Sequence, residues 1–507
     1  MQNQFKGLVK SIAIYGFGNI SIKLIGLILL PLFTNVKILS VNEYGVLGVL
    51  ETTTLIITSL FSLSLYSAYI RWYWDKDYVE KRKSILFSCY LVLLFIGIVL
   101  STSGLIGSKT LSLLLFDKED FYLPLRLMIV AASSQFLIDL TLSQMRVEEK
   151  PSLYVTTNVI RLFVSLTATI LLLKYAHRGL VGIYEAQLIG NIVFILITIP
   201  YIIKRTKARV NFHVISEMLN YSIPLALAAV SNVLLSVFDR YVLNYKSTLL
   251  NVGIYTLGFK IANTTKVFIV SSVQLALAPT FFKLMDHPDH KAIYSRIMTW
   301  FTILVVFVSL FLSLFGLEII KVFSKSTIYW SAYQVIPVLS LGIVFAMLKD
   351  VSVVGLQITK KTKIIGVMLF GVAVLNLVIN LMLVPRFGTM GAAYSSFVSQ
   401  FIFFILIFWF AQKHYSIPYR LDKISIIILT GIAVYIAGSL TNNLTTEVRI
   451  PLKLILFIGF PLLLFLFRIF DKKEIALIKS FIDSIKKFVG NTSYKEIDEQ
   501  ASKIEEP

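Results

Sequence analysis

The chain has 507 residues, of which 57% are hydrophobic and only 15% are charged, and its formal net charge is +20 at pH 7. A water-soluble protein of this length needs a polar coat that this composition cannot supply. The positive charge does not indicate nucleic-acid binding, because it gathers in short segments between long apolar runs. Each run is close to the roughly 20 residues that span a bilayer core.

These runs predict an all-α polytopic membrane protein with about 14 transmembrane helices and almost no mass outside the bilayer. The predicted spans, in chain order, are 10–35, 44–70, 84–107, 123–146, 152–174, 179–203, 217–243, 250–282, 293–322, 329–356, 363–384, 389–411, 424–441 and 450–470. After residue 470, apolar residues at helical spacing alternate with lysines, and a polar stretch follows. This pattern is typical of a helix on the anionic membrane surface or of a solvated amphipathic tail, with a disordered end.

Lys and Arg residues are divided unevenly between the two sets of loops. With a cytoplasmic N-terminus, the cytoplasmic loops carry about twice as many of them as the loops on the far side. The heaviest clusters, which all fall on that side, are Lys81-Arg82-Lys83, Lys204-Arg205 with Lys207 and Arg209, and Lys360-Lys361 with Lys363. Because basic loops resist translocation, the sequence predicts that both termini are cytoplasmic.

Two pairs of short motifs repeat at an offset of about 210 residues, each at corresponding predicted spans. The pairs are Leu47-Gly48 with Leu257-Gly258, and Gly179-x-x-Gly182 with Gly388-x-x-Gly391. Repeated halves with an even number of spans are parallel repeats, as in transporters whose two bundles rock against each other. The predicted organisation is a six-helix lobe at 1–209, a second at 210–415, two further helices at 416–470 and a cytoplasmic tail at 471–507.

Several charged residues fall within predicted spans, where a charge near mid-bilayer costs about 2.5–3.5 kcal/mol. Helical spacing places many of them on polar stripes, which we expect to face one central cavity. The basic residues predicted to line this cavity and bind substrate are Lys23, Arg161, Lys260, Lys266 and Lys349. The acidic residues that are candidates for ion or proton coupling are Glu51, Asp139, Glu185 and Asp350.

The alternative is that these charges form static pairs between or along helices. The neighbours Lys349 and Asp350, and Asp239 and Arg240, favour that interpretation. For Lys23, Arg161 and Lys260, no acid lies at pairing distance along the same helix, which favours a cationic cavity for an anionic substrate such as a diphosphate.

The sequence also lacks the patterns of several other functions. It has no Walker-type glycine loop, no Cys/His cluster with metal-ligand spacing and no loop longer than about fifteen residues. We therefore expect no enzyme activity, no catalytic residue, no cofactor and no metal site. Transport would then draw on an ion gradient, the membrane potential or mass action.

Three groups of motifs carry a family resemblance. They are Leu30-Pro31 with Glu43-Tyr44-Gly45, Asp239-Arg240-Tyr241 with Val252-Gly253-Ile254-Tyr255, and Asn376-x3-Asn380-x4-Pro385-Arg386 with Gly388-Thr-Met-Gly391. Their order and placement resemble the polysaccharide-transport branch of the multidrug/oligosaccharidyl-lipid/polysaccharide exporter superfamily, and most closely the O-antigen and exopolysaccharide repeat-unit flippases of bacteria. The resemblance implies two six-helix lobes in a V around a cationic lumen. It also implies that an undecaprenyl-diphosphate-linked oligosaccharide moves from the cytoplasmic to the periplasmic leaflet.

The same resemblance implies a place in the bacterial inner membrane and a part in O-antigen, lipopolysaccharide, capsule or exopolysaccharide synthesis. The implied partners are the lipid-linked oligosaccharide, membrane lipids, and a polymerase with its chain-length machinery, but no nucleic acid. Lys23 occupies the position in the first helix where lipid-linked-sugar members of the superfamily often have a basic residue. The aspartate loop of peptidoglycan-precursor flippases is not recognisable, which argues against that substrate.

Two other functions stay open at this point. An ion-coupled drug or metabolite exporter of the same superfamily would have a more acidic or aromatic cavity. A membrane-embedded oligosaccharide polymerase or glycosyltransferase would carry a long external loop or a metal-binding acidic motif, and this chain has neither.

Overall fold

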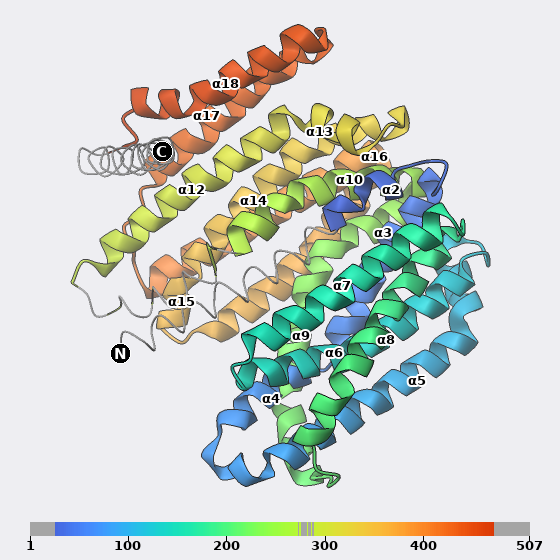
Figure 1. Ribbon diagram of the computed structural model, residues 1–507. Helices are drawn as coiled ribbons and strands as arrows, with labels where there is room; N and C mark the ends of the chain where they lie inside the picture. Colours follow the sequence, from blue (N-terminus) through green and yellow to red (C-terminus); the bar gives the residue numbers. More distant parts are fainter. Residues whose placement is uncertain (1–25, 272, 275–280, 282–284, 286–287, 471–507) are drawn as a thin grey trace, which may run out of the picture. The chain divides into compact units, whose positions relative to one another are not determined.

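The computed structural model describes residues 26–271, 273–274, 281, 285 and 288–470. Within these ranges every regular element is a helix, as the apolar pattern predicts (Figure 1). Two units are distinguished by their internal contacts, Met1–Tyr419 and Arg420–Pro507. Lys23, most of the predicted first span and the predicted tail lie outside the described residues.

From residue 26 on, the first half of the larger unit contains six long or medium helices and two short elements. They are α2 (Leu30–Phe33), α3 (Val41–Phe61), α4 (Leu65–Trp74), η1 (Lys76–Lys81), α5 (Arg82–Phe116), α6 (Tyr122–Val147), α7 (Pro151–Lys174) and α8 (Gly179–Arg205). A capping box between Ser40 and Glu43 starts α3. The predicted unbroken span 44–70 is wrong, because Leu63 and Ser64 adopt positive φ angles of 48° and 49° and separate α3 from α4.

In the described part of the second half, nine elements follow. They are α9 (Phe212–Lys246), α10 (Leu249–Thr264), η2 (Thr265–Val270), α12 (His290–Leu314), α13 (Gly316–Phe323), η3 (Thr327–Gln334), α14 (Val335–Ser352), α15 (Val354–Ile358) and α16 (Thr362–His414). Within α16, Gly388 has φ 53° and ψ −126°, a conformation that only glycine adopts without strain. This residue divides α16 into two helices, at the position between predicted spans 363–384 and 389–411.

The smaller unit consists of α17 (Leu421–Ser439), η4 (Leu440–Asn443) and α18 (Thr446–Leu466). Its two long helices pack against each other. Both are long and apolar enough to cross a bilayer, as predicted for the last two spans.

Among the described residues, 11 helices are long and apolar enough to cross a membrane. The prediction of about fourteen differs for identifiable reasons. The element α16 holds two predicted spans, one on each side of Gly388, and α10 has only 16 residues because the π-helical η2 follows it. The first span falls mostly outside the described part of the chain. Fourteen therefore stays a prediction.

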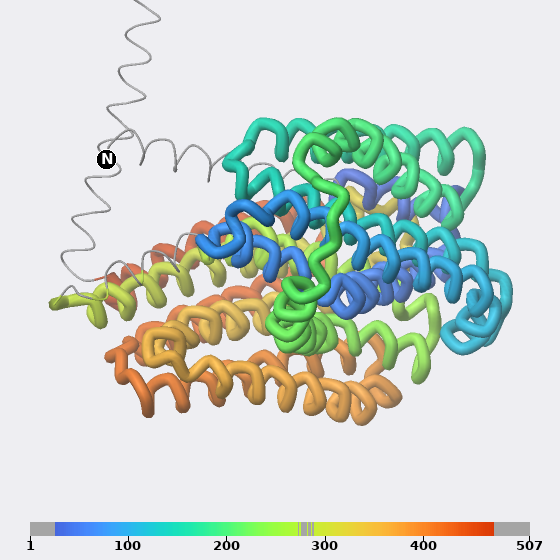
Figure 2. The backbone as a smooth tube through the Cα atoms, turned by 90° about the horizontal axis from the view of Figure 1, so that it is seen from below, coloured from blue at the N-terminus to red at the C-terminus, as the bar shows by residue number. Residues whose placement is uncertain are grey.

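Helix α9 packs against both halves of the larger unit. Near its start, Val214, Ile215 and Met218 share an apolar cluster with Leu65 of α4 and Leu86 of α5. Further along, Leu235 of α9 shares an apolar cluster with Val372 and Phe403 of α16. Figure 2 shows the green linker between α8 and α9 passing the blue α4–α5 segment. Helix α9, which follows the predicted lobe boundary at residue 210, thus contacts both halves.

Candidate functional site

The two halves meet closely where α3 packs against α10, the second helix of each predicted lobe. Three glycines allow this approach. A Cβ atom on Gly45 would lie 2.0 Å from the Leu249 carbonyl oxygen, and one on Gly253 would lie 2.9 Å from the Val41 carbonyl oxygen. A Cβ atom on Gly48 would lie 2.4 Å from the Thr256 hydroxyl oxygen. The two helices are therefore in near-backbone contact at the end predicted to be periplasmic.

An ion pair crosses this interface deeper in the span. The Lys260 Nζ atom donates to Glu51 Oε1 at 2.8 Å, and the exposed side-chain fractions are 21% and 40%. The ammonium group also lies 5.6 Å from the centre of the Tyr44 ring and 5.9 Å from that of Phe33, within the range of cation–π attraction. The pair therefore shares an aromatic-walled, half-buried environment, where a charge is stable only with a partner.

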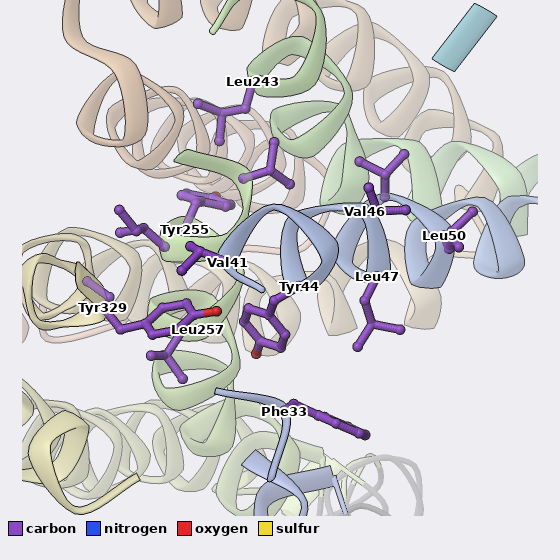
Figure 3. Close-up of a cluster of buried hydrophobic side chains, with 14 of the residues drawn as sticks. Phe33, Val41, Tyr44, Val46, Leu47, Leu50, Leu243, Tyr255, Leu257 and Tyr329 are labelled. Atoms are coloured by element: carbon purple, nitrogen blue, oxygen red, sulfur yellow. The ribbon is translucent and has the colours of Figure 1, made fainter. Parts of the chain in front are cut away.

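Buried aromatic side chains surround this contact. The rings of Tyr44 and Tyr329 meet edge to face with centroids 5.7 Å apart. Figure 3 shows these two rings pointing towards each other, with Leu257 of α10 beside them. A second polar contact links the halves nearby, because the Thr53 and Tyr241 hydroxyl oxygens are 2.7 Å apart. Residues of α3, α9, α10 and η3 thus form one contact region between the repeats, which we call the inter-repeat contact.

The sequence did not predict the pairing of Glu51 with Lys260, because only acids along the same helix were considered as partners. The spacing of the two residues, however, indicates the pair. The two residues are 209 positions apart, nearly the offset of the repeated motifs. In proteins built from two repeats that face each other, near-equivalent positions approach each other at the interface, so opposite charges at such positions can pair.

Arg161 takes part in a different network inside the first half. Its Nε atom donates to Asn191 at 3.0 Å and one Nη atom donates to Gln135 at 2.5 Å. Gln135 in turn donates to Asp139 at 2.7 Å, and Asn191 donates to Ser134 at 2.7 Å. This network ties α6, α7 and α8 together. The side-chain amide of Gln135 thus links Arg161, a predicted cavity cation, with Asp139, a predicted coupling acid.

The remaining predicted charges lie in separate contacts. Glu185 forms an ion pair with Arg178, and Lys349 forms one with its neighbour Asp350. Asp350 also accepts a hydrogen bond from Gln274. Lys266 is exposed and lines a small cavity of about 60 Å³ between α9, α10, α14 and α16. All four predicted acids thus contact a partner. The static pair of neighbours that the sequence favoured for Lys349 and Asp350 is present.

Asp239, by contrast, does not pair with the guanidinium of its neighbour. Its buried carboxylate accepts hydrogen bonds from the Tyr255 hydroxyl, the Ser396 hydroxyl at 3.4 Å and the Arg240 backbone N–H at 2.9 Å. The Arg240 guanidinium instead lies 4.1 Å from the centre of the Phe259 ring. Within the described residues, no group of three or more His, Cys, Asp or Glu side chains has the arrangement of a metal site.

The described helices that are long and apolar enough to span a membrane define the class of multi-pass helical membrane proteins, and the two halves of the larger unit meet through polar contacts. Comparison with known proteins identifies the family. The model of the family described as "Polysaccharide biosynthesis protein" matches residues 8–285, and the chain belongs to this family.

The fold is also that of solved transporter structures. The lipid II flippase MurJ in an inward closed conformation matches 89% of this chain and 98% of its own, with a TM-score of 0.70 and 15% identity. An inward-facing multidrug resistance MATE transporter of the MOP superfamily matches 82% of this chain and 96% of its own, with a TM-score of 0.63 and 13% identity. These matches show that the chain shares the all-helical fold of these structures, in agreement with the predicted fold class.

A curated sequence relative is an uncharacterized membrane protein of Methanocaldococcus jannaschii. It is 25% identical over 242 residues, which are 47% of this chain and 47% of that protein. The chain thus matches about half the length of this relative.

Proposed function

We propose that the protein moves a lipid-linked oligosaccharide, carried on undecaprenyl diphosphate, from the cytoplasmic to the periplasmic leaflet by alternating access. The observation that supports this most directly is the Glu51–Lys260 ion pair, which joins corresponding helices of the two repeats. Membership of the polysaccharide biosynthesis family supports the substrate class. The product would serve assembly of O-antigen, capsule or exopolysaccharide in a bacterial inner membrane, with a polymerase and chain-length machinery downstream.

The Glu51–Lys260 pair suggests how the two halves close and separate. With the inter-repeat contact closed, Lys260 satisfies Glu51 and the end predicted to be periplasmic is shut. When the halves separate there, both charges lose their partner in a low-dielectric span. A diphosphate group supplies negative charge for Lys260 at that moment, so substrate stabilises the open state. Glu51, once released, can take up a proton or a cation, which makes it the acid that we assign to coupling.

The other predicted cations have different parts in this proposal. Lys266 and Lys349, together with Lys23, would supply further positive charge along the substrate path. Arg161 has its guanidinium engaged by Gln135 and Asn191, so we assign it to holding the first half together. Asp139, Glu185 and Asp350 keep a partner within their own half, which makes them weaker candidates for coupling than Glu51.

Purified protein in proteoliposomes tests the proposal. A fluorescent undecaprenyl-diphosphate-linked disaccharide, incorporated symmetrically, is quenched by dithionite only in the outer leaflet. We expect the protein to make the inner-leaflet pool accessible, and we expect Lys260→Gln to slow this by about tenfold or more, the effect of losing one charged contact. Glu51→Gln should alter the dependence of the rate on pH or sodium.

The control is a protein-free liposome preparation and the variant Lys361→Gln, which changes an exposed loop lysine. If the lipid stays protected while a cationic dye is expelled in response to an ion gradient, the protein is a drug exporter of the same fold. The resemblance to the MATE transporter makes that the alternative to exclude.

A further inference from the structure

An open cavity of about 520 Å³ lies at the end of the first half that is predicted to be cytoplasmic. It is bounded by the end of α4, the start of α5, the corner between α6 and α7, and the end of α8. Its lining has three basic side chains and two acidic ones beside an aromatic and aliphatic wall; the residues are Arg82, Lys150, Arg205, Glu148, Glu149, Tyr73, Trp74 and Val147. None of them belongs to the inter-repeat contact, so this cavity is separate from the site described above.

Glu148 organises one wall of the cavity. Its carboxylate accepts hydrogen bonds from Gln144, Lys150 and Arg205, each at 2.6 Å, and from Tyr201 at 3.0 Å. Partial burial raises the pKa of the Glu148 carboxyl, but the hydrogen bonds from Lys150, Arg205 and Tyr201 outweigh that effect and hold the pKa below its ordinary value. The carboxylate therefore stays charged and fixes Arg205 and Lys150 in place.

Two guanidinium groups in the cavity are anchored by one edge only. Arg82 donates through Nε to the Tyr73 carbonyl at 2.6 Å and lies 4.4 Å from the centre of the Tyr73 ring. Arg205 donates through Nε to Glu148 and lies 4.0 Å from the centre of the Tyr201 ring. Among the described residues, the Nη groups of Arg82 have no acceptor, and those of Arg205 make only a 3.5 Å contact with the Tyr201 carbonyl. Paired N–H donors of this kind match the oxygens of a phosphate group.

The surroundings of the cavity add positive charge and an aromatic edge. The Lys207 N–H donates to the Lys83 carbonyl at 3.2 Å, so the linker after α8 lies against the start of α5 (Figure 2). This contact brings together two of the basic clusters, which in the sequence served only to predict the orientation of the chain in the membrane. Trp74 is 58% exposed at the rim, as is usual for aromatic residues at the level of lipid headgroups. Such a combination attracts anionic lipids of the cytoplasmic leaflet.

We propose that this cavity binds the phosphate group of a membrane lipid through the free guanidinium edges of Arg82 and Arg205. The ligand chemistry is a lipid-attached phosphate. An anionic phospholipid and an isoprenyl diphosphate both present it, and the experiment separates them. The proposal does not depend on the function proposed above, because no residue is shared between the two sites.

The full-length protein, purified in detergent, is titrated in native mass spectrometry with phosphatidylglycerol and with diacylglycerol of the same acyl chains. Undecaprenyl diphosphate and undecaprenol form the second pair. We expect the phosphate-bearing member of at least one pair to bind at least tenfold more tightly than its phosphate-free partner. Arg82→Gln should weaken that binding by about tenfold, and Arg82→Gln with Arg205→Gln by more. The pair that responds identifies the source of the phosphate.

Arg296→Gln is the matched control, because Arg296 is an exposed arginine near the start of α12, on the same predicted side. If the double variant unfolds, Arg82→Gln alone decides the question, since its losses within the described chain are limited to the Nε hydrogen bond and the ring contact with Tyr73. Equal binding of phosphate-bearing and phosphate-free lipids overturns the proposal. So does a loss in Arg82→Gln no larger than that in Arg296→Gln, which would mean general charge attraction.

Discussion

Some charged side chains inside this fold are held by partners from other helices and not by neighbours along the chain. Lys260 shows this most clearly, because its acid, Glu51, comes from the other half of the larger unit. A half-exposed pair of this kind contributes about 1 kcal/mol or less to folding. Its larger effect is on the balance between open and closed halves, because the pair exists only when α3 and α10 touch.

The charge pair predicts a specific pattern in a double-mutant cycle. Glu51→Gln and Lys260→Gln should each favour separation of the two halves, whereas the exchange of Glu51→Lys with Lys260→Glu should restore the closed state. Spin labels on α3 and α10, measured by double electron–electron resonance, report the separation. Lipid translocation should recover less than closure does, because the lysine then stands on the other helix. Additive effects of the two neutral variants would show that the pair does not couple the halves.

Arg161 gives a contrasting prediction. Arg161→Met leaves the Gln135 and Asn191 side chains without a donor in a buried network, which costs about 1–3 kcal/mol. We expect a lower unfolding temperature in detergent and partial rescue by Arg161→Lys. A variant with native stability but abolished translocation would instead assign Arg161 to the substrate path, as the sequence predicts.

At the scale of the helix, hydropathy located most elements but not their interruptions. Apolar runs predict where α5, α7 and α8 lie, because burial in lipid requires about 20 apolar residues whatever the details of the backbone. The break at Leu63 and Ser64 carries no such signal, since neither residue type favours a positive φ angle. The site was predictable only in part for the same reason. Residue types showed which charges fall in spans, but their partners depend on how the repeats face each other.

The contact between α3 and α10 predicts the effect of added volume. In Gly45→Ala the new methyl group would overlap the Leu249 carbonyl, so the halves should no longer close at this end. In a Cys89→Ala background, a cysteine at the buried position Val41 should then react several times faster with a water-soluble maleimide. Gly107→Ala is the control, because nothing lies within 4 Å of its Cβ position. Unchanged labelling in Gly45→Ala would contradict the close contact.

For the whole molecule, the distribution of basic residues predicts orientation. Tags inserted after Arg209 and Lys363 should be cytoplasmic, and tags near Lys246 and Arg386 should be periplasmic. Protease protection in spheroplasts and inverted vesicles measures this directly. A periplasmic tag at Lys363 would invert the orientation, and the direction of transport proposed above would then lose its basis.

Helix α9 has a consequence for how the polypeptide could be divided. Its first turns pack on α4 and α5, while Leu235 in its later turns packs on α16. A cut in the linker at residues 206–211 would therefore separate the chain into two polypeptides that already carry matching docking surfaces. Expressed together as 1–209 and 210–507, the fragments should assemble in the membrane, and an affinity tag on one should recover the other. Recovery of both fragments together would show that the packing of α9 holds the two halves together without the covalent linker.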